Sequence, residues 1–321
     1  MSAAKEAQVE FITFDVFTSK RYEGNPLAVV KIPNSTSLSQ KQKQDIAREF
    51  NLSETTFWHQ PTGIGELPTW TVDIFMTTKE LPFAGHPTIG TACYLLSSIA
   101  KERGLTEGII NGQFNIKAGK IDLVYDVASN RARAGIPHDV HVHEKTWSQQ
   151  DLSNLQPRLA QTSESQGFEL KENYPIVSIV KGMTFVLIEL SSLEALELVK
   201  TTSGSIHVEG LDEGWGPSFI GTYFFVRLAG KTDGTRVIRT RMIEGTMEDS
   251  ATGSAASDLA AYLSLVEGQA GQTLRYDIVQ GVEMGRRSNI GVEVVLAEQS
   301  GIAQLYLEGS AVQVMEGKLA L

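Results

Sequence analysis

The chain has 321 residues, enough for two ordinary domains, and its 41% hydrophobic and 21% charged residues are typical of a globular protein. Lys and Arg total 28 against 38 Asp and Glu, and the resulting net charge of −10 argues against nucleic acid or an anionic membrane as a partner. The single cysteine, Cys93, excludes an internal disulfide and a metal site built from cysteines.

Residues 1–10 contain no apolar run of the kind found in secretory signals. No stretch of the sequence approaches the roughly 20 apolar residues that a membrane span needs. Because a lone cysteine also fits a reducing compartment, we expect the protein to be cytoplasmic.

The first half of the sequence predicts a helix that ends near Phe50 and a strand with Glu54 at its start. Apolar residues fall on every second position over 69–74, which predicts a half-buried strand. A helix is expected over 87–100, with a proline in its first turn, where a missing N–H is tolerated. Residues 114–125 predict two strands joined at a glycine.

The second half of the sequence likewise predicts several strands and one main helix. Alternating patterns predict the strands 184–190, 223–228, 236–243 and 290–296. A second helix is expected over 252–265, with Asp249 or Ser250 available as its N-cap. Polar residues dominate the stretch 132–174, where we place the boundary between the halves.

The two predicted helices both begin with small residues, and aligning Gly85 with Ala251 and Thr88 with Ser254 brings out this likeness. We therefore predict an internal duplication, with two similar α+β halves. The expected N-terminal half is residues 1–131 plus 306–321, and the expected C-terminal half is residues 132–305. Each helix N-terminus would offer free N–H groups to an anion.

Common signatures for nucleotide binding, zinc proteases and serine hydrolases are absent. His138, His141 and His143 lie close together and could bind a metal. Alternate histidines in a polar linker are usually solvated, so we favour solvated side chains and expect no metal site.

Three acid–base side chains lie beside predicted elements, and each has an ordinary structural interpretation. Glu54 could be a solvated residue at a strand edge, His86 a capping or core histidine, and Asp249 a simple helix N-cap. What distinguishes them is the set of motifs in which they occur.

These motifs together resemble the PhzF family, the phenazine biosynthesis-like isomerases. They follow the family's order across nearly the whole chain, at residues 15–18, 24–30, 52–57, 81–88, 248–256 and 280–286. The resemblance implies a diaminopimelate-epimerase-like α+β fold, with two similar halves, each a curved sheet around a central helix, and the active site in the cleft between them. The best-known member isomerises trans-2,3-dihydro-3-hydroxyanthranilate without a metal or an organic cofactor, and members are commonly homodimers.

The resemblance also implies roles for particular residues. Glu54 matches the glutamate that moves the proton, and His86 and Asp249 match residues that surround and polarise the substrate. The residues that match the substrate-binding positions are Ser53, Gly85, Gly253 and Ser254.

The residue types agree with this chemistry. A carboxylate in a closed apolar pocket has a raised pKa and can take a proton from one carbon and return it to another. Two-base epimerases of related type use a cysteine at the start of each central helix, and those places correspond here to Ala84 and Ser250. The sequence therefore disfavours a two-thiol racemase.

Two alternatives stay open at this point. The same fold could serve a non-catalytic protein that binds a small molecule or a partner, since a fold does not fix a function. An epimerase or hydro-lyase acting through Glu54 is the other. The loop before Asp249 is shorter than in family members, and Trp58 and His59 follow the glutamate strand, so the identity of the substrate is not fixed.

Overall fold

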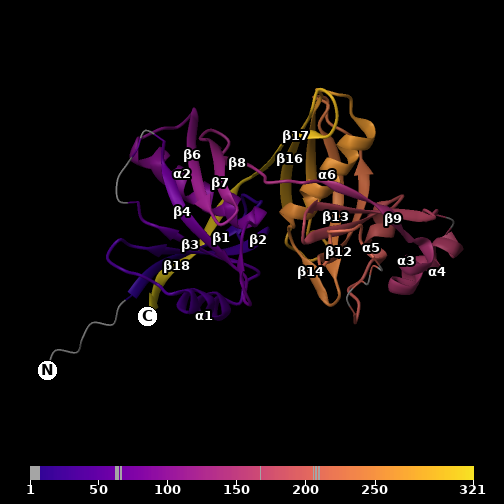
Figure 1. Ribbon diagram of the computed structural model, residues 1–321, viewed down its shortest axis with the longest axis horizontal. Coiled ribbons are helices and arrows are strands. Elements are labelled where there is room, and N and C mark those ends of the chain that lie inside the picture. The colour runs from indigo at the N-terminus through magenta and orange to yellow at the C-terminus, as the bar shows by residue number, and fades with distance from the viewer. Residues whose placement is uncertain are drawn as a thin grey trace. The chain divides into compact units, whose positions relative to one another are not determined.

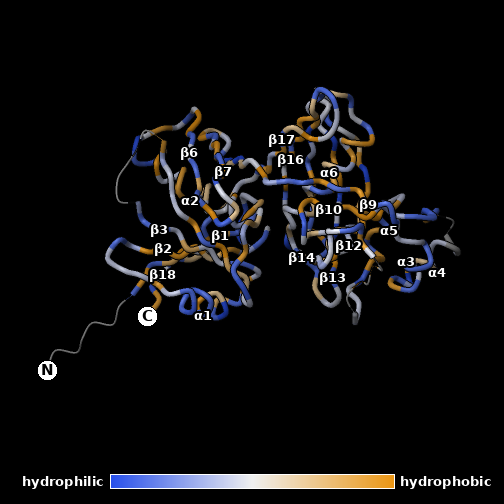
Figure 2. The backbone as a smooth tube through the Cα atoms, viewed as in Figure 1, coloured by the Kyte–Doolittle hydropathy of each residue, from blue (hydrophilic) through white to orange (hydrophobic). Residues whose placement is uncertain are grey.

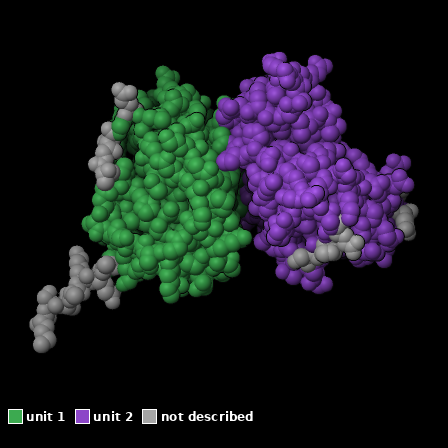
Figure 3. All heavy atoms as spheres, in the orientation of Figure 1, with its two compact units in different colours: residues 1–135, 308–321 green, residues 136–307 purple. Residues whose placement is uncertain are grey.

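A computed structural model describes residues 8–61, 65, 67–166, 168–204, 206, 208 and 210–321. Residues 1–7, which belong to the segment without a signal-like run, lie outside this description. The chain divides into two compact units, unit 1 with residues Met1–Gly135 and Glu308–Leu321 and unit 2 with residues Ile136–Leu307 (Figure 3). Among the described residues, no helix has both the length and the apolar character needed to cross a membrane.

Unit 1 is a strongly curved sheet in which most neighbouring strands are antiparallel. Its strands are β1 (Gln8–Val16), β2 (Asn25–Ile32), β3 (Thr55–His59), β4 (Thr69–Phe75), β5 (Glu80–Leu81), β6 (Ile109–Ile116), β7 (Gly119–Asp126), β8 (Arg131–Gly135) and β18 (Ala311–Ala320). Among the described strands, the pairs β2–β3 and β4–β6 are parallel. The last strand of the chain, β18, returns to pair with the first, β1, and appears in yellow among the indigo strands of Figure 1.

Helix α2 (Gly85–Glu102) forms the centre of unit 1 and contacts strands β1, β2, β3, β6, β7, β8 and β18. It is buried on most sides, as its apolar sequence requires, and Figure 2 shows hydrophobic segments concentrated around it. The amphipathic helix α1 (Gln40–Phe50) instead packs one face on the outer side of β3 and β4. Ser39 and Gln42 form a capping box that fixes the start of α1.

Unit 2 has the same architecture. Its strands are β9 (His141–Ser148), β10 (Asn173–Val180), β11 (Met183–Glu189), β12 (Phe219–Leu228), β13 (Arg236–Glu244), β14 (Met247–Asp249), β15 (Thr273–Gln280), β16 (Ser288–Leu296) and β17 (Ile302–Gly309). The central helix is α6 (Gly253–Glu267), which contacts β10, β11, β15 and β16. The remaining helices are α3 (Gln149–Leu155), α4 (Pro157–Gln166) and α5 (Leu193–Leu198).

The strand pairings of the two units match one another. In each unit an antiparallel pair is followed by a parallel pair, then a short hairpin, the central helix and a second parallel pair; these pairs are β1–β2, β2–β3, β4–β5 and β4–β6 in unit 1 and β10–β11, β11–β12, β13–β14 and β13–β15 in unit 2. The structure thus confirms two similar α+β halves, each with a curved sheet around a central helix.

The alignment of the two central helices differs from the one drawn on the sequence. Hairpin partners Ile74 and Leu81 correspond to Met242 and Asp249, and α2 begins at Gly85 where α6 begins at Gly253. This register lies two residues from the alignment of Gly85 with Ala251. It yields identical residues at Gly85 and Gly253, Ala92 and Ala260, Tyr94 and Tyr262, and Leu95 and Leu263.

The predicted strands and both central helices are confirmed, with ends that differ by a few residues. The polar stretch 132–174, where the boundary between the halves was expected, forms β9, α3 and α4 over most of its length. Its apolar residues are too widely spaced for a strong periodic signal. They include Trp147, Leu152 and Leu159, which are buried in the core of unit 2.

Candidate active-site residues

Glu54 lies at the junction between α1 and β3. The chain leaves α1 at Asn51, which adopts the left-handed conformation, and enters β3 at Thr55. Within β3, the Thr56 hydroxyl is 3.0 Å from the Thr91 hydroxyl on α2. This buried bond ties the strand that follows Glu54 to the central helix, and so keeps Glu54 near the start of that helix.

His86 is the second residue of α2 and lies beside Glu54. Its Nδ1 is 3.5 Å from Glu54 Oε2, and the side chains are 6% and 15% exposed, respectively. Burial lowers the pKa of His86 from 6.5 to about 3, while a hydrogen bond to the Pro26 backbone acts in the opposite direction. His86 is therefore a neutral imidazole at physiological pH, placed against a carboxyl group.

The second ring nitrogen of His86, Nε2, is buried and has no hydrogen-bond partner among the described residues. A buried polar atom without a partner lowers stability, and such atoms are rare in native proteins. The start of α2 adds backbone N–H groups, because its N-cap, Ala84, offers no side-chain acceptor for them. A buried imidazole nitrogen beside a helix N-terminus is suited to binding the polar groups of a small ligand.

In unit 2, Asp249 ends β14 and is held by the turn that leads into α6. Its Oδ2 accepts a hydrogen bond of 2.7 Å from the Thr252 hydroxyl. Thr252 is the N-cap of α6, and the helix begins at Gly253. The expectation that Asp249 or Ser250 would cap α6 is wrong, because β14 extends to Asp249 and a turn separates it from the helix.

Gln280, from the late sequence motif, braces this turn. Its amide donates to the Asp249 carbonyl at 2.9 Å and to the Thr252 hydroxyl at 3.0 Å. The next residue, Gly281, has a φ of +73°, and a Cβ there would lie 2.6 Å from the Ser250 carbonyl oxygen. Only glycine fits both this backbone conformation and this close approach.

Glu248, adjacent to Asp249, is committed to a structural ion pair. Arg241 donates to both of its carboxylate oxygens, at 2.7 and 2.8 Å. The same guanidinium donates to the carbonyls of Leu196 and Val199. Arg241 is 4% exposed, so this network fixes the β13–β14 hairpin that carries Asp249.

The structure thus brings Glu54 and His86 into contact within unit 1 and places Asp249 in a braced turn of unit 2. The expected substrate-binding residues are close to these three residues in the sequence. Gly85 and Gly253 are buried at the first positions of their helices, Ser254 is half-buried, and Ser53 is exposed.

Some contacts of residues named in the sequence analysis could not be predicted from the sequence. His59 pairs with Asp73 at 2.8 Å, in a cluster that also includes Lys43. The interpretation of the three neighbouring histidines as solvated is wrong for His143, which is 4% exposed. By the structural alignment, the helix-start position that corresponds to Ala84 is Thr252 rather than Ser250, and neither is a cysteine.

Comparisons with known proteins point to the same family as the sequence motifs. The family model of phenazine biosynthesis-like proteins, PhzC-PhzF, matches residues 14–317. An uncharacterized isomerase of Mesorhizobium japonicum is 32% identical, over 96% of this chain and 98% of its own length. The trans-2,3-dihydro-3-hydroxyanthranilate isomerase of Pseudomonas aeruginosa is 31% identical, over 94% of this chain and 98% of its own length.

Solved structures agree on the fold. A PhzF-family phenazine biosynthesis protein of Bacillus anthracis superposes with a TM-score of 0.73 at 21% identity, covering 98% of this chain and all of the other. A hydroxyproline epimerase of Agrobacterium vitis gives a TM-score of 0.57 at 14% identity, covering 98% and 93%. These likenesses confirm the diaminopimelate-epimerase-like fold expected from the motifs. The chain therefore belongs to the PhzC-PhzF family of phenazine biosynthesis-like proteins, and it is an isomerase of that family.

Proposed function

We propose that this isomerase moves a proton along an allylic or enol system of a small metabolite that bears a carboxylate, with Glu54 as the general acid and base and without a cofactor. The observation that carries this proposal is the pairing of Glu54 with a buried, neutral His86 whose second nitrogen is unpaired. Such a pair combines a proton acceptor with a polar group that can orient a substrate.

In the proposed reaction, the Glu54 carboxylate takes a proton from a carbon of the conjugated system. The electron pair of that C–H bond moves into the system, the double bond shifts, and Glu54 returns the proton to a different carbon. No oxidation or reduction occurs, and no group leaves. His86 and Asp249 would polarise the substrate, and the substrate-binding residues would be Ser53, Gly85, Gly253 and Ser254.

The substrate class rests on the relatives. Proteins 31% and 32% identical to this chain are named trans-2,3-dihydro-3-hydroxyanthranilate isomerases, so that compound is the first to be tested. A panel of small enol and β-keto acids extends the test to related substrates. We also propose a role in secondary metabolism, a cytoplasmic location and a homodimer, for which sedimentation should give twice the mass of one chain.

The deciding experiment is proton NMR of the purified enzyme with each compound in deuterated water. We expect deuterium in the carbon that receives the proton, and a loss of about 10²–10⁴-fold in turnover for Glu54→Gln. The matched control is Glu49→Gln, the same change on an exposed residue of α1, which should keep full activity.

Circular dichroism should show that Glu54→Gln stays folded. Full activity in a folded Glu54→Gln protein would refute the proton-transfer role. Deuterium exchange with inversion at a single carbon would instead indicate an epimerase, and loss of water would indicate a hydro-lyase.

A further inference from the structure

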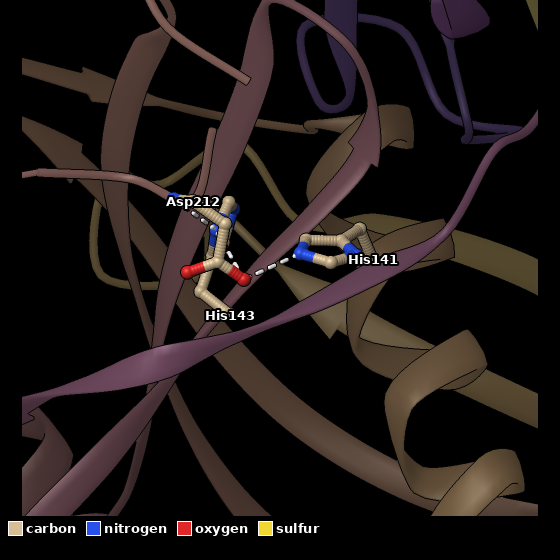
Figure 4. A group of neighbouring side chains, drawn as sticks. All are labelled: His141, His143 and Asp212. Atoms are coloured by element: carbon tan, nitrogen blue, oxygen red, sulfur yellow. Dashed lines mark hydrogen bonds and ion pairs between the residues drawn. The ribbon is translucent and has the colours of Figure 1, made fainter. Parts of the chain in front are cut away.

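A second cluster of chemistry-bearing side chains lies in unit 2, apart from the residues used in the proposed isomerisation. His141 and His143 are two residues apart on β9, so their side chains project from the same face of the strand. Asp212, from the loop before β12, reaches the same place, and Figure 4 shows its carboxylate linked to both imidazoles.

The distances within the cluster are short. Asp212 Oδ2 is 2.7 Å from His141 Nε2 and 3.7 Å from His143 Nδ1, and the three potential ligand atoms all lie within 4.8 Å of one another. Ligands at about 2.0–2.1 Å from a tetrahedral zinc ion are separated by about 3.3 Å. To reach this value, Asp212 Oδ2 would move about 0.6 Å away from His141 Nε2 and about 0.4 Å toward His143 Nδ1. The two imidazole nitrogens, which lie within 4.8 Å of each other, would approach by up to about 1.5 Å as an ion draws them together.

The orientation of His143 is already fixed by its other nitrogen. Nε2 lies 2.9 Å from the Ser178 hydroxyl, which is in turn 2.7 Å from the Thr184 hydroxyl. The backbone N–H of Asp212 donates to Nδ1 at 3.2 Å, so Nδ1 carries the lone pair. A histidine held through one ring nitrogen, with the lone pair of the other available to an ion, is the usual arrangement of a metal ligand, and here the ion would take the place of the Asp212 N–H at Nδ1.

The orientation of His141 is fixed by an aromatic neighbour. Its ring stacks on Trp215 with a centroid distance of 4.5 Å and an interplanar angle of 10°. His141 is 34% exposed and Asp212 is 23% exposed, whereas the His143 side chain is fully buried. The cluster therefore has a rigid inner side and an outer side that solvent ions can reach.

We propose that His141 Nε2, His143 Nδ1 and Asp212 Oδ2 bind a divalent transition-metal ion of the Zn²⁺ type. Two imidazoles and one carboxylate favour such an ion over Mg²⁺ or Ca²⁺, which prefer all-oxygen ligands. Water would fill the fourth position, and the ion would replace the hydrogen bond between His141 Nε2 and Asp212 Oδ2. The ion would fasten the loop that carries Asp212 to β9 and so stabilise unit 2.

The test is Zn²⁺ binding to the full chain after removal of any histidine tag, measured by calorimetry and by metal analysis after desalting. We expect one Zn²⁺ per chain and a rise in the unfolding temperature that grows with Zn²⁺ concentration. Asp212→Asn and His141→Gln should each weaken binding at least about 10-fold, and Ser178→Ala about 10–100-fold. Mg²⁺ at the same concentrations should cause no shift.

The matched control is His138→Gln, which removes a histidine of the same segment. Its two ring nitrogens lie 2.9 Å and 3.4 Å from the carbonyl oxygens of Ile136 and Ile302, outside the cluster. This variant should bind Zn²⁺ like the wild type. The proposal is overturned if the wild type does not bind Zn²⁺ at micromolar concentrations, or if Asp212→Asn and His141→Gln, shown to be folded, bind as well as the wild type.

Discussion

The two central helices, α2 and α6, occupy equivalent places in their units, but they carry different residues at an equivalent buried position. At the sixth position of α2 stands Gly90, where a Cβ would lie 2.6 Å from a methyl group of Leu27 and 2.7 Å from one of Val16. The equivalent residue of α6 is Asp258, which is fully buried and has no hydrogen-bond partner for either carboxylate oxygen among the described residues.

This difference shows how a duplicated framework can diverge. In unit 1 the sheet closes onto the helix so tightly that only glycine fits, whereas unit 2 leaves room for a carboxylic acid. Burial raises the pKa of Asp258 well above its usual value of 3.8 and so favours its protonated, neutral form in the folded protein. Burial shifts the pKa of His86, in α2, in the opposite direction, so in each helix it favours the neutral form of a titratable group.

The largest effect is expected when the residue of α6 is placed in α2. Gly90→Asp would bring a carboxyl group against Leu27 and Val16, both of which are fully buried. Overpacking together with an unpaired polar group should lower the free energy of unfolding by at least about 3 kcal/mol. Soluble yield and thermal unfolding measure this loss, and Gly90→Ala should show a smaller one. A native unfolding temperature for Gly90→Asp would contradict the close packing of α2.

The next largest effect concerns Asp258. A raised folded pKa means that stability is fully present below about pH 3.8 and falls as the pH rises toward the folded pKa, since the unfolded chain gains by ionising first. Asp258→Asn removes this loss. We expect the stability of the variant relative to the wild type to increase as the pH rises above about 3.8. Urea unfolding at several pH values measures the gap, and a gap that is independent of pH would show that Asp258 is ionised in the folded protein.

His86 should show the opposite slope. Its lowered folded pKa gives stability that is present above pH 6.5 and lost as the pH falls toward 3, because the unfolded chain binds the proton first. His86→Asn lacks this dependence. The wild type should lose about 2 kcal/mol relative to the variant between pH 6.5 and about pH 4.5. Parallel pH profiles of the two proteins would argue against a buried neutral histidine.

The smallest effect is expected at Cys93, whose equivalent in α6 is Ala261. Cys93→Ala places the residue of unit 2 into unit 1 and removes one buried sulfur atom, so we expect a loss of about 1 kcal/mol. Burial raises the pKa of Cys93 to about 12, and the native thiol should resist alkylation until the protein unfolds. Rapid alkylation of the folded protein would show that α2 is less tightly enclosed.

The sequence predicted the family, the α+β fold and the segments that carry Glu54, His86 and Asp249. These features depend on local patterns: alternating strands, two helices that begin with small residues, and motifs in a fixed order. The short segment between Phe50 and Thr55 likewise indicated that Glu54 stands at the entrance to a strand. Local patterns of this kind persist because backbone geometry and side-chain periodicity act over a few residues.

Only the tertiary structure decided which distant groups meet. It brought Glu54 to within 3.5 Å of His86 and placed Asp212 beside His141 and His143 from about seventy residues away. It also showed which residue of α2 corresponds to which residue of α6. It also left Asp258 buried without a partner. Contacts and pKa shifts of this kind arise from burial and from neighbours that are remote in the chain, and no local pattern of residues encodes them.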